Sequence, residues 1–224
     1  MSYIRIKKSG EKIAVSKILC VGANYSDHIA EMNPGKSAEL PKEPVIFMKP
    51  PSAIVHDGEN IIFPDVQSEL HHEVELIVVI GKDGKNIKAA DADSHILGYG
   101  IGLDMTLRDL QAEAKKKGRP WTIAKGFDTS AVISEIAGKN EVNQVNDLPL
   151  KLFINDALRQ EGRTSDMIFT VSDIIVYLSK FFTLCRGDVI FTGTPKGVGP
   201  VQTGDYLRAV LGEYAEVTVS VKKI

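Results

Sequence analysis

The stretch HHEVELIVVI, residues 71–80, decides the fold, because its hydrophobic pattern fits a strand with two apolar faces. Side chains of an extended chain alternate between the two faces of the strand. One face then carries Val74, Leu76, Val78 and Ile80, and the other carries Glu73, Glu75, Ile77 and Val79. Apart from the two acids, both faces are apolar. We therefore expect a strand that is buried on both sides.

Glu73 and Glu75 lie two residues apart on one face of this strand, next to aliphatic side chains. Two buried anions repel each other, and each costs several kcal/mol to remove from water. A hard divalent cation such as Mg²⁺ or Mn²⁺ would neutralise them, because both ligands are oxygens. Three alternatives stay open: a solvated strand end, pairing with Lys49 or Lys125, and a transition-metal site that includes His71. The zinc-protease motif HExxH is absent.

The stretch GYGIGLD, residues 98–104, predicts a second strand, whose alternating glycines allow close backbone approach on one face. Asp104 ends this strand and supplies a third acid, although an aspartate is also typical of a helix start. A helix is expected over Thr106–Lys117, and it places Arg108 and Gln111 on one face. The glycine spacing lacks the GxGxxG order of dinucleotide sites.

Two further segments carry candidate functional groups. The stretch NYSDHIAEM, residues 24–32, predicts a short helix over Ser26–Met32 that places His28 and Glu31 one turn apart. At that spacing a carboxylate can orient an imidazole as a general base, although such pairs also occur by chance. The stretch GTPKGVGP, residues 193–200, lacks the order of a P-loop, so a tight connection after a strand is the simpler interpretation.

Short strands outnumber helices along the rest of the chain. Further strands are expected at 18–22, 45–48, 60–63, 150–154, 188–192 and 217–221. A helix over Val171–Phe182 is expected to be capped by Thr170, and the segments 36–44 and 139–148 are expected to be loops. Strands and helices do not alternate strictly, which favours an α+β fold. No repeat or linker divides residues 1–224, so one domain is expected.

The composition narrows the class of protein. The chain has 224 residues, with 27 Lys and Arg against 29 Asp and Glu, so no basic excess favours nucleic acid or an anionic membrane. The N-terminal region contains no apolar run long enough for a membrane span or a signal peptide, and we expect a cytoplasmic protein. Cys20 and Cys185 lie far apart, which favours inert thiols over a disulfide, a metal site or a nucleophile.

Five segments together resemble the fumarylacetoacetate hydrolase superfamily: CVGANYSDHIAEM (20–32), PVIFMKP (44–50), LHHEVELIVVIGK (70–82), GYGIGLDMTLRDLQAEAKKKGRPWTIAKGFD (98–128) and IFTGTPKGVGP (190–200). They occur in order, and the likeness extends from about Lys17 to Leu207. Within the superfamily the chain is most similar to the short, single-domain acylpyruvate hydrolases, which also decarboxylate oxaloacetate. The resemblance implies a β-rich mixed-sheet roll with short peripheral helices, and a homodimer.

The resemblance also implies roles for individual residues. The metal-binding triad would consist of Glu73, Glu75 and Asp104. The metal would be Mg²⁺, with Mn²⁺ as a possible substitute. The catalytic residues would be His28, Glu31 and Lys125. The residues that line the substrate pocket would be Arg108, Gln111 and Thr192.

These assignments imply a Mg²⁺-dependent hydrolase that cleaves the C–C bond of 3-acylpyruvates, such as acetylpyruvate or fumarylpyruvate, to pyruvate and a carboxylic acid. This cleavage would leave the enolate of pyruvate, and loss of CO₂ from oxaloacetate would leave the same enolate. His28, oriented by Glu31, would activate water, and Lys125 would stabilise negative charge. Two alternatives are an isomerase or tautomerase of a 2-oxo or 2-hydroxy-diene dicarboxylate, and a non-catalytic module that binds a metal or a small acid. Residues 26–40 are expected to be either a lid or an ordinary loop.

Overall fold

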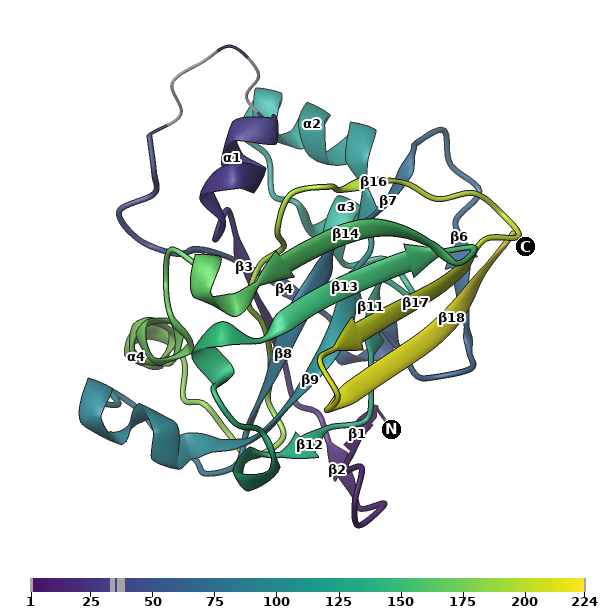
Figure 1. The fold of residues 1–224 in the computed structure, drawn as a ribbon. Helices are drawn as coiled ribbons and strands as arrows, with labels where there is room; N and C mark the ends of the chain where they lie inside the picture. The colour runs from purple at the N-terminus through teal and green to yellow at the C-terminus, as the bar shows by residue number, and fades with distance from the viewer. Residues whose placement is uncertain (1, 33–34, 36–38, 224) are drawn as a thin grey trace.

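Two large sheets dominate the computed structural model, which describes residues 2–32, 35 and 39–223 (Figure 1). The larger sheet has eight strands in the order β4–β3–β15–β8–β9–β11–β5, with β12 paired to β9. The pairs β3–β15 and β5–β11 are parallel, and the other neighbours are antiparallel. These strands are β4 (Val45–Lys49), β3 (Ile18–Gly22), β15 (Val189–Phe191), β8 (Val74–Ile80), β9 (Ile96–Asp104), β11 (Ala131–Ile133), β5 (Ile54–Val55) and β12 (Ala137–Gly138).

The second large sheet has five strands. Their order is β14 (Ala157–Arg163), β13 (Pro149–Ile154), β17 (Tyr206–Leu211), β18 (Ala215–Lys223) and β6 (Asn60–Phe63). A three-stranded sheet, β10–β7–β16, spans Thr106–Leu107, Leu70–His72 and Gly199–Pro200. A hairpin joins β1 (Tyr3–Arg5) to β2 (Lys12–Ala14). The expected α+β, mixed-sheet roll is therefore confirmed.

The helices are short, and α1, α2 and α4 lie at the edge of the molecule in Figure 1. They are α1 (Ser26–Met32), α2 (Arg108–Lys117), α3 (Thr122–Lys125) and α4 (Val171–Phe181). Five 3₁₀ segments span Pro51–Ala53, Ala89–His95, Lys139–Glu141, Val145–Asp147 and Thr164–Asp166. Thr170 caps α4 as expected, because its side chain accepts a hydrogen bond from the amide of Asp173. Among the described residues, no helix is both long and apolar enough to cross a membrane.

Two sequence expectations need correction. The expected helix over 106–117 begins only at Arg108, because Thr106 and Leu107 pair with β7 as a short strand. The expected loop over 139–148 contains two 3₁₀ turns. Parts of the expected loop at 36–44 and of the expected lid at 26–40 lie outside the described residues.

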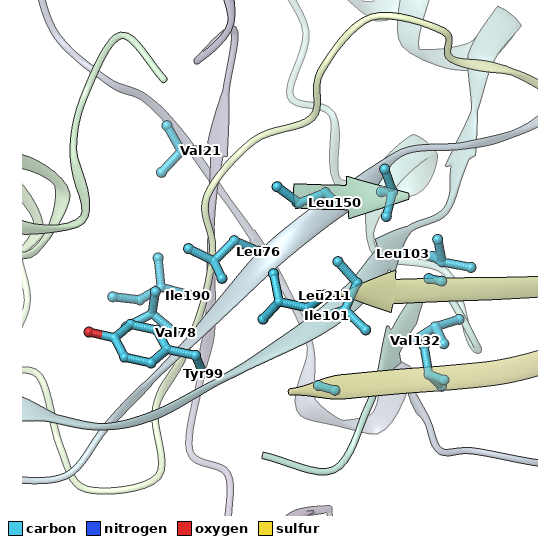
Figure 2. Close-up of a cluster of buried hydrophobic side chains, with 14 of the residues drawn as sticks. Val21, Leu76, Val78, Tyr99, Ile101, Leu103, Val132, Leu150, Ile190 and Leu211 are labelled. Atoms are coloured by element: carbon cyan, nitrogen blue, oxygen red, sulfur yellow. The ribbon is translucent and has the colours of Figure 1, made fainter. Parts of the chain in front are cut away.

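The central strand β8 is buried along its whole length, as its sequence predicts. Its face with Leu76 and Val78 packs in the larger core cluster, together with Leu150 and Leu211 of the second sheet (Figure 2). The opposite face packs Ile77 into a smaller cluster that includes residues of the N-terminal hairpin. By the alternation of side chains along the strand, the two acids of the 71–80 stretch belong to this second face.

Candidate active site

The two neighbouring strands β8 and β9 bring the three predicted metal-binding acids together. Glu73 immediately precedes β8, Glu75 is the second residue of β8, and Asp104 is the last residue of β9. The amide of Asp104 donates to the carbonyl oxygen of Glu73 over 2.9 Å, which fixes the two strands at this point. All three side chains are buried, and each offers one oxygen within 4.8 Å of the others.

Three basic side chains contact two of these acids. Lys125 Nζ lies 2.7 Å from Glu73 Oε2 and 2.6 Å from Asp104 Oδ2. Lys49 Nζ lies 2.7 Å from Asp104 Oδ1, and Arg108 Nη2 lies 2.5 Å from Glu73 Oε1. Burial opposes ionisation of Glu73, but the charges of Lys125 and Arg108 outweigh it and lower its pKa. Lysine pairing, left open from the sequence as an alternative for Glu73 and Glu75, is therefore present for Glu73, and both lysines also contact Asp104.

Glu75 has no ion pair with any described residue. Its Oε2 accepts a hydrogen bond of 2.7 Å from the amide of Gly193. Burial raises the pKa of Glu75 well above its usual range, and the nearby charges of Asp104 and Glu73 raise it further. The lysines thus leave one of the three carboxylates without a cation.

The donor set fits a hard divalent cation. Asp104 Oδ1 is buried and has no hydrogen-bond donor, because Lys49 contacts it as a charge without a well-aligned N–H. Together with Glu75, this oxygen can accept a further positive charge, and an oxygen-only set suits Mg²⁺ or Mn²⁺. The alternative of a transition-metal site that includes His71 does not fit. Both ring nitrogens of His71 already have contacts, Nε2 with Glu69 and Nδ1 with Arg108, and among the described residues the group that could hold a metal ion consists of the three acids alone.

A cavity of about 140 Å³ lies in front of Glu73 and Glu75. Its polar wall also contains His28, Arg108, Gln111, Lys115, Lys125 and Thr194, and its apolar wall includes Phe47 and Trp121. Arg108 Nη1 donates to Gln111 Oε1 over 2.7 Å, so the expected pair on one face of α2 is in contact. For Lys125, burial lowers the pKa, but the charges of Asp104 and Glu73 outweigh this effect and raise it, so the lysine stays protonated.

The helix α1 places His28 in the wall of this cavity. His28 Nδ1 lies 3.4 Å from Glu31 Oε2, a long contact, and the Glu31 carboxylate also accepts from the amide of Gly197 at 3.0 and 3.1 Å. Burial lowers the pKa of His28, and the charges of Glu73 and Glu31 only partly offset this. The imidazole is therefore neutral near pH 7 and can accept a proton.

Thr192 lies elsewhere than expected. Its hydroxyl donates to the carbonyl oxygen of Leu76 over 3.0 Å, and its side chain is fully buried and does not line the cavity, whereas Thr194 does. Thr194 is not among the residues expected from the sequence, although it lies in the glycine-rich stretch 193–200, and Lys49 is expected only as a possible partner for Glu73 and Glu75. A lysine at the end of the apolar strand 45–49 is the signal that could have revealed this buried charge.

The structure thus combines three buried acids that could hold a metal ion with a histidine in the wall of the same cavity, on a mixed-sheet roll. The chain belongs to the fumarylacetoacetate (FAA) hydrolase family, whose C-terminal model matches residues 17–223. It is 47% identical over 206 residues to the mitochondrial oxaloacetate tautomerase FAHD1 of Homo sapiens. This alignment covers 92% of this chain and 91% of the human protein.

Two solved structures show the same fold. The fumarylpyruvate hydrolase from Pseudomonas aeruginosa, in complex with Mn²⁺ and pyruvate, has a TM-score of 0.91 and 35% identity, over 99% of this chain and 96% of that chain. The 2-hydroxyhepta-2,4-diene-1,7-dioate isomerase from Mycobacterium marinum has a TM-score of 0.81 and 38% identity, over 94% and 76% of the two chains. Members of the family are thus enzymes with several related activities.

Proposed function

We propose that the protein is a Mg²⁺- or Mn²⁺-dependent enzyme that forms the enolate of a small 2-oxo acid, and that oxaloacetate tautomerisation is its first activity. The observation that carries the proposal is the neutral imidazole of His28 in the wall of the cavity that Glu73 and Glu75 also line. The volume of about 140 Å³ suits an acid of a few carbon atoms. The relative with 47% identity is named as an oxaloacetate tautomerase.

Glu73, Glu75 and Asp104 would hold the cation. A bound Mg²⁺ or Mn²⁺ supplies positive charge beside the carboxylate and keto oxygens of the acid, which stabilises negative charge on the enolate oxygen. The structure with Mn²⁺ and pyruvate supports this choice of cation and of ligand class.

In this proposal the cavity side chains move one proton and hold the acid. His28 exchanges a proton between C3 and the enol oxygen, and Glu31 orients the imidazole. Lys125, whose pKa its acidic neighbours raise, and the Arg108 guanidinium balance the negative charge of the ligand. Gln111 and Thr194 offer polar contacts from the wall of the cavity, whereas the Thr192 hydroxyl donates to the carbonyl oxygen of Leu76, outside this wall.

Hydrolysis of 3-acylpyruvates, with decarboxylation of oxaloacetate as a related reaction, is the second candidate. It is favoured by the His28–Glu31 pair, because a carboxylate behind an imidazole suits the activation of water. The fold likeness to the fumarylpyruvate hydrolase supports it as well. For an acylpyruvate, His28 would take a proton from water, and the hydroxide would attack the distal carbonyl carbon.

The experiment is a substrate panel with Mg²⁺ that contains oxaloacetate, acetylpyruvate and fumarylpyruvate. Enol absorbance reports tautomerisation, and release of pyruvate or CO₂ reports cleavage. Accelerated loss of enol oxaloacetate without pyruvate would establish the first activity, and release of pyruvate from acylpyruvates the second. Saturable binding of these acids without turnover would instead identify a non-catalytic module.

The variant His28→Gln tests the proposed base. We expect it to lose activity by about 100-fold or more, because general-base catalysis contributes that much. Its Mg²⁺ affinity, measured by calorimetry, should stay within about threefold of wild type, since His28 is outside the metal-competent group. An undiminished rate would remove His28 from its role.

We further propose that residues 1–224 form one catalytic domain, that it works as a homodimer and that it lies in the cytoplasm. The single family match over residues 17–223 supports the first part. Light scattering after size exclusion would test the assembly. Fractionation of the source cells would test the compartment, since the human relative is named as mitochondrial.

A further inference from the structure

Gln160 is a buried polar side chain on an otherwise solvated edge strand. Its neighbours on β14 are exposed or half-buried, while Gln160 is 2% exposed. Its amide contacts four groups: Val74 N at 3.0 Å, His72 Nδ1 at 2.8 Å, Thr194 Oγ1 at 2.9 Å and Pro195 O at 3.0 Å. It therefore connects the beginning of β8 to the loop after β15.

The chemistry of these partners fixes the orientation of the amide. The amide of Val74 can only donate, so the Gln160 atom near it must be the carbonyl oxygen. The carbonyl of Pro195 can only accept, so the atom near it must be the NH₂ group. His72 then donates from Nδ1 to the Gln160 oxygen, and a second N–H of Gln160 points at Thr194 Oγ1.

This orientation decides which way the Thr194 hydroxyl donates. Because Thr194 Oγ1 accepts from Gln160, its own hydrogen must point elsewhere. Among the described residues, its acceptor is the carbonyl of Pro195, which lies 3.4 Å from Thr194 Oγ1 in a bond that is long for O–H···O. An acceptor at a shorter distance in the cavity that Thr194 lines can therefore take this hydrogen.

We infer that Gln160 is a positioning residue that turns the Thr194 hydroxyl into a hydrogen-bond donor toward the carboxylate of the bound acid. Gln160 itself does not line the cavity, so it acts through Thr194. The inference rests on the proposed function for the identity of the ligand. Through Thr194, Gln160 would make the site prefer a ligand group that accepts a hydrogen bond, such as a carboxylate oxygen, over a group that donates one.

The variant Gln160→Glu tests the inference, because it keeps the shape of the side chain and replaces its donor by an acceptor. The Thr194 hydroxyl would then donate to the new carboxylate and present a lone pair to the cavity. We expect the dissociation constant of oxalate, measured by calorimetry at saturating Mg²⁺, to rise by about tenfold or more. Thr194→Val should produce a similar rise, and Thr194→Ser should retain wild-type affinity.

A double-mutant cycle separates positioning from general damage. If Gln160 acts through Thr194, the double variant Gln160→Glu/Thr194→Val should bind oxalate no more weakly than Thr194→Val alone. Gln160→Met serves if the buried carboxylate prevents folding, and we expect a smaller loss of about threefold, also absent in the Thr194→Val background. Glu161→Gln, at an exposed neighbouring position on β14, is the matched control and should leave oxalate affinity unchanged.

Two results would overturn the inference. Wild-type oxalate affinity in Gln160→Glu, or losses that add in the double variant, would show that Gln160 does not act through Thr194. Absence of oxalate binding by the wild-type protein at saturating Mg²⁺ would overturn the proposed function and this inference together. The metal affinity of each variant, measured without oxalate, should equal that of the wild type, because Gln160 touches none of the three acids.

Discussion

The variant Glu75→Gln tests whether the Glu75 carboxylate lacks a compensating positive charge in the protein without a bound metal ion. The neutral amide keeps the acceptor for Gly193 and replaces a buried carboxyl group whose ionised form burial, Asp104 and Glu73 disfavour. In EDTA at pH 7, we expect the free energy of unfolding to rise by about 1 kcal/mol, as measured in urea, because folding no longer has to protonate this carboxylate or bury its charge. The exposed control Glu161→Gln should change it by less than about 0.5 kcal/mol. Destabilisation of Glu75→Gln by several kcal/mol would mean that the charge is already compensated.

His72 gives the stability of the protein a dependence on pH. Burial lowers the pKa of His72 to about 4, and the hydrogen bond to Gln160 only partly offsets this. The unfolded chain binds a proton below about pH 6.5, whereas the folded protein does not until about pH 4. The contribution of the neutral His72 to the free energy of unfolding is therefore complete above pH 6.5 and is lost as the pH falls toward 4.

The variant His72→Asn keeps a side-chain N–H for Gln160 but does not titrate. Between pH 6.5 and 4.5, the wild type should lose about 2 kcal/mol more unfolding free energy than this variant, since each unit of pKa shift is worth about 1.4 kcal/mol. Urea unfolding at both pH values, in EDTA, measures the difference. Parallel losses in the two proteins would contradict the assignment.

At the residue scale, the sequence predicts the acids better than their surroundings. Glu73 and Glu75 stand out because charged residues interrupt an apolar strand, and that signal is local. Thr194 and Gln160 carry no such signal: one lies in an irregular loop, and the other is one polar residue among several on β14. Their importance follows from contacts between segments 34 residues apart in the chain.

At the element scale, close packing on β9 makes a glycine essential. A Cβ at Gly102 would come within 2.5 Å of the Val132 carbonyl oxygen and 2.8 Å of Ile77 Cδ1. We expect Gly102→Ala to lower the free energy of unfolding by about 1–3 kcal/mol, because the packed strands have no room for a methyl group. At Gly138, paired with the same strand, the nearest atom would be 3.4 Å away. Gly138→Ala should therefore change stability by less than about 0.5 kcal/mol in the same urea experiment, and equal losses would contradict this account.

Elements with a strong hydrophobic pattern are predicted well. The strands at 18–22 and 60–63 and the helix at 26–32 have the expected bounds, and the strand expected within 71–80 spans 74–80. The strand β14 is missed because it is an edge strand with mostly exposed, polar side chains, so it has no buried face to create a pattern. β10 is read as helix because two residues that pair with β7 directly precede α2. In both cases tertiary pairing overrides local preference.

At the scale of the whole molecule, the candidate site is assembled from segments that are distant in the sequence. α1, the ends of β8 and β9, α2, α3 and the loop after β15 each contribute side chains to the cavity wall or to the acids behind it. The order of these segments in the sheets is not readable from local patterns, because their pairs span up to about 170 residues. Such a site exists only in the folded chain, so its ligands must stabilise the fold.

This linkage predicts that Mg²⁺ or Mn²⁺ raises the unfolding temperature. A ligand that binds only the folded state at 100 times its dissociation constant adds about 2.7 kcal/mol, which for a chain of this size corresponds to about 5–10 °C. Scanning calorimetry with and without the cation measures the shift. In Glu75→Gln the shift should largely disappear, because one of the three ligand oxygens loses its charge, whereas Glu161→Gln should show the wild-type shift. A cation-induced shift of equal size in Glu75→Gln would place the cation away from the three acids.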